Sequence, residues 1–315
     1  MSGDGGAASS SSRAAMRLER IGGHMTELLE LHAHKGPALQ IVFVPGNPGV
    51  VAYYQEYLDA LYDILEGGAS VTAISHIAHV SRDWEDAGRL FSLQEQIDHK
   101  LEFVQQQLNQ RPDVPLILVG HSIGAYIIME ILRRFPSQVQ QVIGLYPFVT
   151  LNRNSQWQGF LRRVSETSAL CTATSTLAGL VGRLPDAVSR GLVKVLLGRV
   201  WDPYAVDITC QHLLQSRVVH NFMYMGRTEF ATLPLEPDWG FLREFQSRIS
   251  FLFGTDDHWG PLSLLVHISK EVPLLKMVVE REGHLHTFSC TKAGSQCVAS
   301  QTANIIISHI ACAHL

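Results

Sequence analysis

The sequence predicts an α/β fold, in which a mostly parallel sheet is covered by helices on both faces. Three observations lead to this prediction: short apolar runs typical of buried parallel strands, helical periodicity between them, and a strand–turn–helix passage around residues 120–124. The composition agrees, because 46% of the 315 residues are hydrophobic and only 17% are charged, which favours a large buried core.

The first half of the chain alternates between predicted strands and predicted helices. The strands share short, apolar or β-branched runs and are expected at residues 39–44, 70–75, 115–120 and 139–145. The helices share apolar residues at every third or fourth position and are expected at residues 53–65, 93–108 and 123–135. This alternation is typical of a parallel sheet, whose strands are connected by helices that cover both faces.

The alternation stops near residue 150 and resumes after residue 240. Strands are then expected at residues 248–254 and 275–279, and helices at residues 262–270 and 299–311. The segment between contains no strand-like run, so we predict a helical lid or insertion after the sixth strand of the fold. The resulting division of the chain is a disordered tail at 1–24, a first core part at 25–149, the insertion at 150–240 and a second core part at 241–315.

The N-terminal residues have almost no apolar weight. Residues 1–15 consist mainly of Gly, Ala and Ser, which predicts a disordered tail, and they lack the apolar core of a secretory signal. A single arginine before Arg17 gives little support for a transit peptide. No transmembrane helix is expected either, because the nearest approach to one, the uncharged run at residues 167–182, spans only sixteen residues and includes six Ser or Thr.

Charge and cysteine content exclude several classes of protein. The net charge of −4 gives no electrostatic support for a nucleic-acid partner. The odd number of cysteines, with no C-x-x-C pair, argues against a disulfide framework or a structural zinc site and favours a reducing compartment. We therefore expect no metal and no cofactor. The five cysteines are Cys171, Cys210, Cys290, Cys297 and Cys312.

Residues 120–124, Gly-His-Ser-Ile-Gly, match the G-x-S-x-G pattern of a nucleophile elbow. A predicted strand runs directly into the motif and a predicted helix follows it, which is the context that an elbow requires. The alternative is a glycine-rich turn with a helix-capping serine. The context favours the elbow, with Ser122 as the nucleophile.

A serine nucleophile needs an imidazole base and an acid that orients it, in the chain order Ser, acid, His for this type of fold. Two aspartates, Asp256 and Asp257, follow the predicted strand at 248–254, and two histidines, His284 and His286, follow the strand at 275–279. Both pairs are expected at the carboxyl ends of strands, where open α/β sheets bind their ligands. Spacing alone does not choose within either pair.

An oxyanion hole requires two backbone N–H groups that face the developing negative charge. One is expected from Ile123, the residue after the nucleophile. The other is expected from the loop at residues 45–49, Pro-Gly-Asn-Pro-Gly, where Pro48 has no N–H and Asn47 or Gly46 remains. A plain Pro/Gly turn is the alternative for this loop.

These motifs together resemble the lipid droplet-associated hydrolases. The resemblance rests on the Pro-Gly-Asn-Pro-Gly loop, the Gly-His-Ser-Ile-Gly elbow, the run Gln-Ile-Asp-His-Lys at 96–100 and the run Gly-Thr-Asp-Asp-His-Trp-Gly-Pro at 254–261. It covers residues 39–147 and 248–288. It implies an α/β-hydrolase fold, a serine ester hydrolase acting on a neutral-lipid ester such as a sterol ester or an acylglycerol, and association with lipid droplets and endoplasmic reticulum.

Carried over residue by residue, the resemblance assigns three catalytic roles. The nucleophile is Ser122, the acid in the G-T-x-D pattern is Asp257, and the base in the H-x-F pattern is His286. One departure is that this chain has Asp-His-Trp where the family commonly has Asp-Pro-Trp. The aspartate itself is unaffected.

The insertion differs in charge from the rest of the chain. Residues 151–200 hold seven basic and two acidic side chains, a net charge of +5. Residues 183–200 have the pattern of a basic amphipathic helix beside the uncharged run at 167–182, which suits a lipid surface on the cytosolic face. One alternative is an internal lid helix packed on the core. Another, for the whole protein, is a lipid-binding or interaction protein of the droplet surface with a weak or idle triad.

Overall fold

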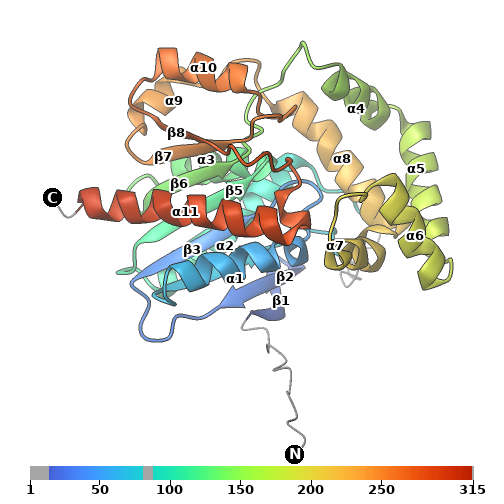
Figure 1. Ribbon diagram of the computed structural model, residues 1–315, viewed down its shortest axis with the longest axis horizontal. Helices are drawn as coiled ribbons and strands as arrows, with labels where there is room; N and C mark the ends of the chain where they lie inside the picture. Colours follow the sequence, from blue (N-terminus) through green and yellow to red (C-terminus); the bar gives the residue numbers. More distant parts are fainter. Residues whose placement is uncertain (1–13, 81–87, 314–315) are drawn as a thin grey trace, which may run out of the picture.

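The computed structural model describes residues 14–80 and 88–313, whose strands form one eight-stranded sheet in the order β1-β2-β4-β3-β5-β6-β7-β8 (Figure 1). Strands β3 to β8 are parallel, and β1 and β2 add an antiparallel edge. The bounds are β1 Ala15–Ile21, β2 His24–Leu31, β3 Leu39–Val44, β4 Ala69–Ile74, β5 Leu116–His121, β6 Val139–Leu145, β7 Ile249–Phe253 and β8 Lys276–Val279.

Helices cover both faces of the sheet, as the alternation predicts. Along β5, Leu116 and Leu118 contact one set of helices while Ile117 and Val119 contact the other, because successive side chains of a strand point to opposite faces. The first face carries α2 (Leu93–Gln110), α3 (Ile123–Arg134), α9 (Trp239–Glu244) and α10 (Leu262–Glu271). The second carries α1 (Gln55–Ile64) and α11 (Lys292–Ala313), which lie side by side in Figure 1.

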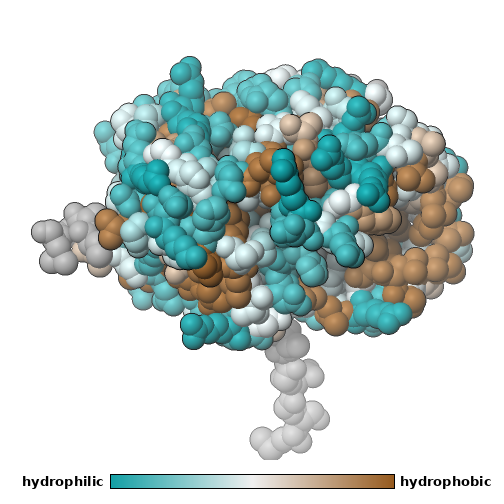
Figure 2. All heavy atoms as spheres, turned by 90° about the horizontal axis from the view of Figure 1, so that it is seen from above, coloured by the Kyte–Doolittle hydropathy of each residue, from teal (hydrophilic) through white to brown (hydrophobic). Residues whose placement is uncertain are grey.

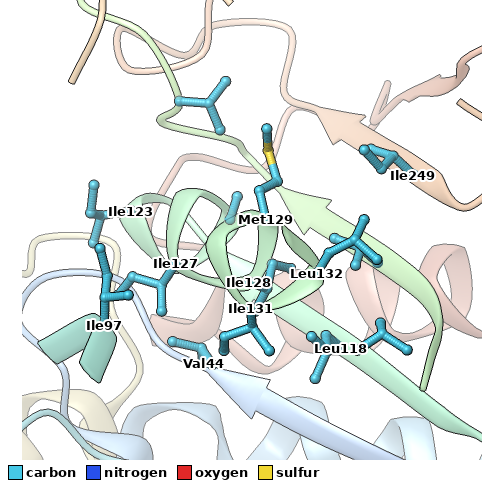
Figure 3. Close-up of a cluster of buried hydrophobic side chains, with 14 of the residues drawn as sticks. Val44, Ile97, Leu118, Ile123, Ile127, Ile128, Met129, Ile131, Leu132 and Ile249 are labelled. Carbon is cyan, nitrogen blue, oxygen red and sulfur yellow. The ribbon is translucent and has the colours of Figure 1, made fainter. Parts of the chain in front are cut away.

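Helix α3 is the most deeply buried helix of the first face. Its apolar side chains pack against Val44 of β3, Leu118 of β5, Ile97 of α2 and Ile249 of β7 (Figure 3). Because α3 begins directly after Ser122, this packing anchors the turn that carries the serine.

The prediction of a disordered tail at residues 1–24 is wrong for residues 15–24. Residues 15–21 form β1 and residue 24 begins β2, while residues 1–13 lie outside the described part of the chain. The two strands are joined by Gly22 and Gly23, whose φ values of 56° and 84° are typical of a tight hairpin turn. Strand β1 is almost entirely exposed, so its pairing depends on backbone hydrogen bonds and on the Arg17–Glu30 ion pair rather than on apolar weight.

The segment between β6 and β7 is helical, as predicted, and contains no strand. It comprises α4 (Gln156–Glu166), α5 (Ser168–Val181), α6 (Asp186–Leu196), α7 (Pro203–Ile208), the π-helical turn η2 (Thr209–Leu213), α8 (Ser216–Thr232) and then α9. Helices α4 to α8 lie together at one end of the molecule (Figure 1). In the part of the chain that the structure describes, every helix is too short or too polar to cross a membrane.

Candidate active site

Ser122 lies in the turn between β5 and α3, with a φ of 54° that residues with side chains rarely adopt. The turn requires small neighbours, because a Cβ on Gly120 would collide with the backbone of Gly124, and a Cβ on Gly124 with the carbonyl of Val44. The Ser122 N–H donates to the Leu145 carbonyl at 2.9 Å. The serine therefore occupies the strained strand–turn–helix geometry that the G-x-S-x-G motif predicts.

Asp257 and His286 come together from two loops at the carboxyl edge of the sheet. Nδ1 of His286 lies 2.9 Å from Oδ1 of Asp257, and the aspartate side chain is fully buried. The same oxygen accepts the Trp259 N–H at 2.9 Å. A buried carboxylate at this distance places the imidazole proton on Nδ1, which leaves Nε2 free to accept another proton.

The second member of each predicted pair lies elsewhere. Asp256 is exposed to solvent. His284 lies beside Glu282, with 3.6 Å between Nε2 and Oε2, and its backbone N–H donates to Glu280. The geometry thus pairs Asp257 with His286, the two residues that the family pattern implies.

Ser122 and His286 line one cavity of about 140 Å³, whose wall includes Trp201 and Leu213 from the insertion. Among the described residues, no hydrogen bond joins the Ser122 hydroxyl to the imidazole of His286. Such bonds are often long in hydrolases without substrate. Four larger cavities, of about 170 to 340 Å³, are lined by none of Ser122, Asp257 and His286. We therefore consider the smaller cavity the candidate site.

The structure narrows the choice of oxyanion donors. The N–H of Gly46 donates to the Tyr54 hydroxyl at 3.1 Å and is therefore engaged. The backbone N–H groups of Asn47 and Ile123 have no partner within residues 14–80 and 88–313. Asn47 also lines the cavity that contains Ser122, and Ile123 begins α3. These two N–H groups are the available donors.

A buried pair, Tyr54 and His121, joins the loop at residues 45–49 to the turn that carries Ser122. The Tyr54 hydroxyl lies 2.7 Å from Nδ1 of His121 while it accepts the Gly46 N–H. Burial lowers the pKa of His121, which is therefore neutral. Its Nδ1 accepts a hydrogen bond from the Tyr54 hydroxyl. Its ring centroid lies 4.8 Å from that of His286. No sequence signal predicted the role of Tyr54, because the contact joins residues 67 positions apart.

The insertion contacts the three loops that carry the candidate acid, the candidate base and the candidate oxyanion donor. Gln158 of α4 donates to the carbonyl of His258 at 3.0 Å, next to Asp257. Tyr204 of α7 donates to the carbonyl of Ser289 at 2.5 Å, in the loop that follows His286. Asn47 donates to Glu229 of α8 at 2.9 Å. The insertion is thus hydrogen-bonded to the core at the site itself, which sequence patterns did not predict.

One group of described side chains has donor atoms close enough to hold a metal ion, namely Glu280, His284 and Cys297. Both oxygens of Glu280 are already engaged, by the N–H groups of Glu282 and His284 and by the hydroxyl of Tyr146. Burial and the nearby Glu282 carboxylate raise the pKa of Cys297 to about 12, so it is a thiol rather than the thiolate that binds metals. The group fits an anchor of the His286 loop better than a metal site.

The outer helices of the insertion present an apolar surface. Figure 2 shows apolar side chains gathered at the end of the molecule that α5 and α6 form. The most exposed of them lie on and just after α6, where Leu196 is 73% exposed. We call this set the outer apolar surface: Trp157, Phe160, Leu170, Leu177, Leu180, Leu184, Val188, Leu192, Val195, Leu196, Leu197 and Val200.

Known proteins resemble this chain in sequence and in fold. The family model of the lipid-droplet associated hydrolases matches residues 37–289. A lipid droplet-associated hydrolase of Gallus gallus is 28% identical over 268 residues, and one of Homo sapiens 26% over 276, each alignment covering 80% of both chains.

Solved structures share the fold at much lower identity. A monoglyceride lipase of Saccharomyces cerevisiae aligns with a TM-score of 0.62 at 13% identity, over 95% of this chain and 97% of its own. The epoxide hydrolase VrEH1 of Vigna radiata gives 0.62 at 14%, over 94% and 99%. These likenesses show an α/β-hydrolase fold.

Proposed function

Because the chain belongs to the lipid droplet-associated hydrolase family, we propose that it cleaves carboxylic esters of neutral lipids with Ser122, His286 and Asp257 as its triad. The observation that carries the proposal is the buried 2.9 Å contact between Asp257 and His286, with His286 and Ser122 lining one cavity. Similarity of fold alone would not support this activity, since proteins of one fold have many different activities.

The proposed mechanism follows from this geometry. Nε2 of His286 accepts the proton of the Ser122 hydroxyl as its oxygen attacks the ester carbonyl, and Asp257 stabilises the imidazolium that forms. The N–H groups of Asn47 and Ile123 donate to the oxyanion of the tetrahedral intermediate. His286 then protonates the leaving alkoxide, and a water molecule deacylates Ser122 by the same route. No step requires a cofactor.

The substrate class is inferred from the cavity and the family. Trp201, Leu213 and Tyr53 give the cavity a mainly apolar wall, which suits an acyl chain rather than a charged group. The relatives are named for lipid droplets, whose cores consist of neutral lipid esters. Sterol esters and acylglycerols both fit this description.

We further propose that the protein works on the cytosolic face of the droplet monolayer and of the endoplasmic reticulum. The outer apolar surface supports this, because most of the large apolar side chains of α6 are exposed, with Val193 the buried exception, whereas an internal lid would pack them on the core. Arg183, Lys194 and Arg199 flank it and suit anionic headgroups. Arg190 contributes less, since it pairs with Asp207 at 2.7 Å.

The decisive experiment compares the wild type with Ser122→Ala. A fluorophosphonate probe should label the wild type and not the variant. Both proteins should unfold at the same temperature, because the Ser122 side chain makes no hydrogen bond to the residues that the structure describes. A screen of short acyl, sterol and glycerol esters should give turnover that depends on Ser122. Equal labelling of the variant would remove Ser122 from the mechanism. Labelling without turnover would favour the rival function, a droplet-surface protein with an idle triad.

A further inference from the structure

Helix α8 of the insertion directly contacts the loop that supplies the proposed oxyanion donor. The side-chain amide of Asn47 donates to the carbonyl of Phe222 and to Oε1 of Glu229, both at 2.9 Å. Both acceptors belong to α8. The Asn47 side chain is therefore held by a helix that lies about 180 residues away in the chain.

Glu229 is unusual because it is buried without a cation. It is 5% exposed, and no ion pair involves it among the described residues. Burial raises the pKa of Glu229 to about 8, so the carboxyl is largely neutral at pH 7. Burial of a polar group costs free energy unless the group is hydrogen-bonded, and the contact to Asn47 meets that requirement. A neutral carboxyl accepts this bond as a side-chain amide would.

Helix α8 is fixed to the core beside this contact. The Asn221 side chain accepts the Phe91 N–H at 3.1 Å, and the Thr228 hydroxyl accepts the Leu93 N–H at 2.8 Å. These bonds join α8 to the start of α2. Asn47 is thus held by a helix that is hydrogen-bonded to the core, whereas the outer apolar surface belongs mainly to α4, α5 and α6.

We infer that Glu229 is a positioning residue, which holds the Asn47 side chain and thereby orients the Asn47 backbone N–H in the oxyanion hole. The inference rests on the proposed function, because it assigns a purpose to the same site. A donor works only when it is aimed at the place where charge develops, so a loosened Asn47 loses transition-state stabilisation while substrate binding is retained.

Two substitutions separate the hydrogen bond from the volume of the side chain. Glu229→Met fills the same space without a strong acceptor, and Glu229→Gln keeps Oε1 as an acceptor for Asn47. We expect Glu229→Met to lower kcat at least about 10-fold, up to the 10²–10³-fold of a removed donor, with KM changed less than about twofold. Glu229→Gln should keep kcat within about threefold of the wild type.

Thr228→Val is the matched control, because it removes a contact between α8 and the core at the adjacent residue without touching the oxyanion loop. It should lower Tm and leave kcat unchanged, because the Asn221 side chain still joins α8 to the core and Glu229 still holds Asn47. The assay is hydrolysis of a short acyl ester, with kcat, KM and Tm measured for each variant and with Ser122→Ala as the blank.

Three results would overturn the inference alone: wild-type kcat in Glu229→Met, equal losses in the Met and Gln variants, or an equal loss in Thr228→Val. If Glu229→Met does not fold, the Glu229→Gln and Thr228→Val variants still test the inference, because a loss of kcat in either of them contradicts it. Absence of Ser122-dependent hydrolysis in the wild type would instead overturn the proposed function, and the inference with it.

Discussion

Asp256 and Asp257 are adjacent in the chain, but only Asp257 is shielded from water and within 2.9 Å of His286. The two histidine side chains are equally exposed, at 19%, but His284 lies beside the exposed Glu282 and His286 beside the buried Asp257. A carboxylate stabilises an imidazolium more strongly when it is buried, since the attraction between the two charges is screened in water. At the residue scale, burial of the carboxylate therefore distinguishes chemically identical side chains.

This contrast predicts the outcome of four paired substitutions. Asp257→Asn should lower kcat by about 10³–10⁴-fold, because an asparagine at this position favours the wrong imidazole tautomer. Asp256→Asn should change kcat less than about twofold, since its side chain is exposed. His286→Ala should abolish turnover and His284→Ala should preserve most of it. Ester hydrolysis by the four purified variants checks this, and a larger loss in Asp256→Asn than in Asp257→Asn would reverse the assignment.

At the scale of secondary-structure elements, the insertion divides into two parts with different surroundings. Gln158, Tyr204 and Glu229 join its inner side to the loops of the site, whereas α6 exposes most of its large apolar residues. Val188, Leu192, Val195 and Leu196 follow the helical period and form one stripe. A stripe without a covering element is typical of a helix that binds a lipid surface.

We predict that Leu192, Val195 and Leu196, replaced together by Ser, no longer hold the protein on droplets. Each large apolar side chain contributes about 1.5–3 kcal/mol when fully buried, so the three changes should weaken binding to lipid emulsions at least about 100-fold. Leu274→Ser is the matched control, because Leu274 is 77% exposed and lies in the turn before β8, at the opposite end of that strand from the site. Co-flotation with phospholipid-coated triglyceride droplets measures the effect.

Deletion of residues 160–200 tests the same surface more drastically. The variant keeps Gln158, Tyr204 and Glu229, so the contacts to the catalytic loops remain. It should be released into the cytosol, whereas Ser122→Ala should stay on droplets because that serine lies within the cavity. A folded deletion variant that still coats droplets would show that the anchor lies elsewhere and that the outer helices serve as an internal lid.

At the scale of the whole molecule, several ionisable side chains are buried in their neutral form. Burial lowers the pKa of His79 to about 3 and also lowers the pKa values of His76, His99 and His121. The folded state therefore binds no proton at these sites near pH 6, whereas the unfolded chain does so below about pH 6.5. Glu229 acts in the opposite direction, because its pKa is raised.

Stability should consequently fall as the pH falls below 6.5. The histidine contribution is complete above that pH, and each buried histidine removes up to about 1.4 kcal/mol of unfolding free energy per pH unit below it. The raised pKa of Glu229 has the opposite effect and offsets the contribution of about one of the four buried histidines. His79→Gln, which can still accept the Gly49 N–H, should reduce the slope by about 1 kcal/mol per pH unit. Urea unfolding at pH 7.5, 6.0 and 5.5 measures it, and an unchanged slope would contradict the prediction.

The sequence by itself determined the fold class and the order of the candidate residues along the chain. Continuous apolar runs predicted the parallel strands, and the glycines of the elbow predicted a tight turn at Ser122, because both depend on contacts between near neighbours. The same reasoning failed at β1. An exposed edge strand needs only backbone partners, so its composition does not distinguish it from a tail.

Only the tertiary structure decided which side chains meet. It placed Asp257 and not Asp256 against His286, engaged the Gly46 N–H with Tyr54, and set Glu229 against Asn47. It also left the apolar stripe of α6 uncovered. Each of these outcomes depends on distances between residues far apart in the chain, and on burial that no local pattern records. The geometry of the candidate site therefore depends on how the loops pack together on the sheet, which the sequence pattern does not specify.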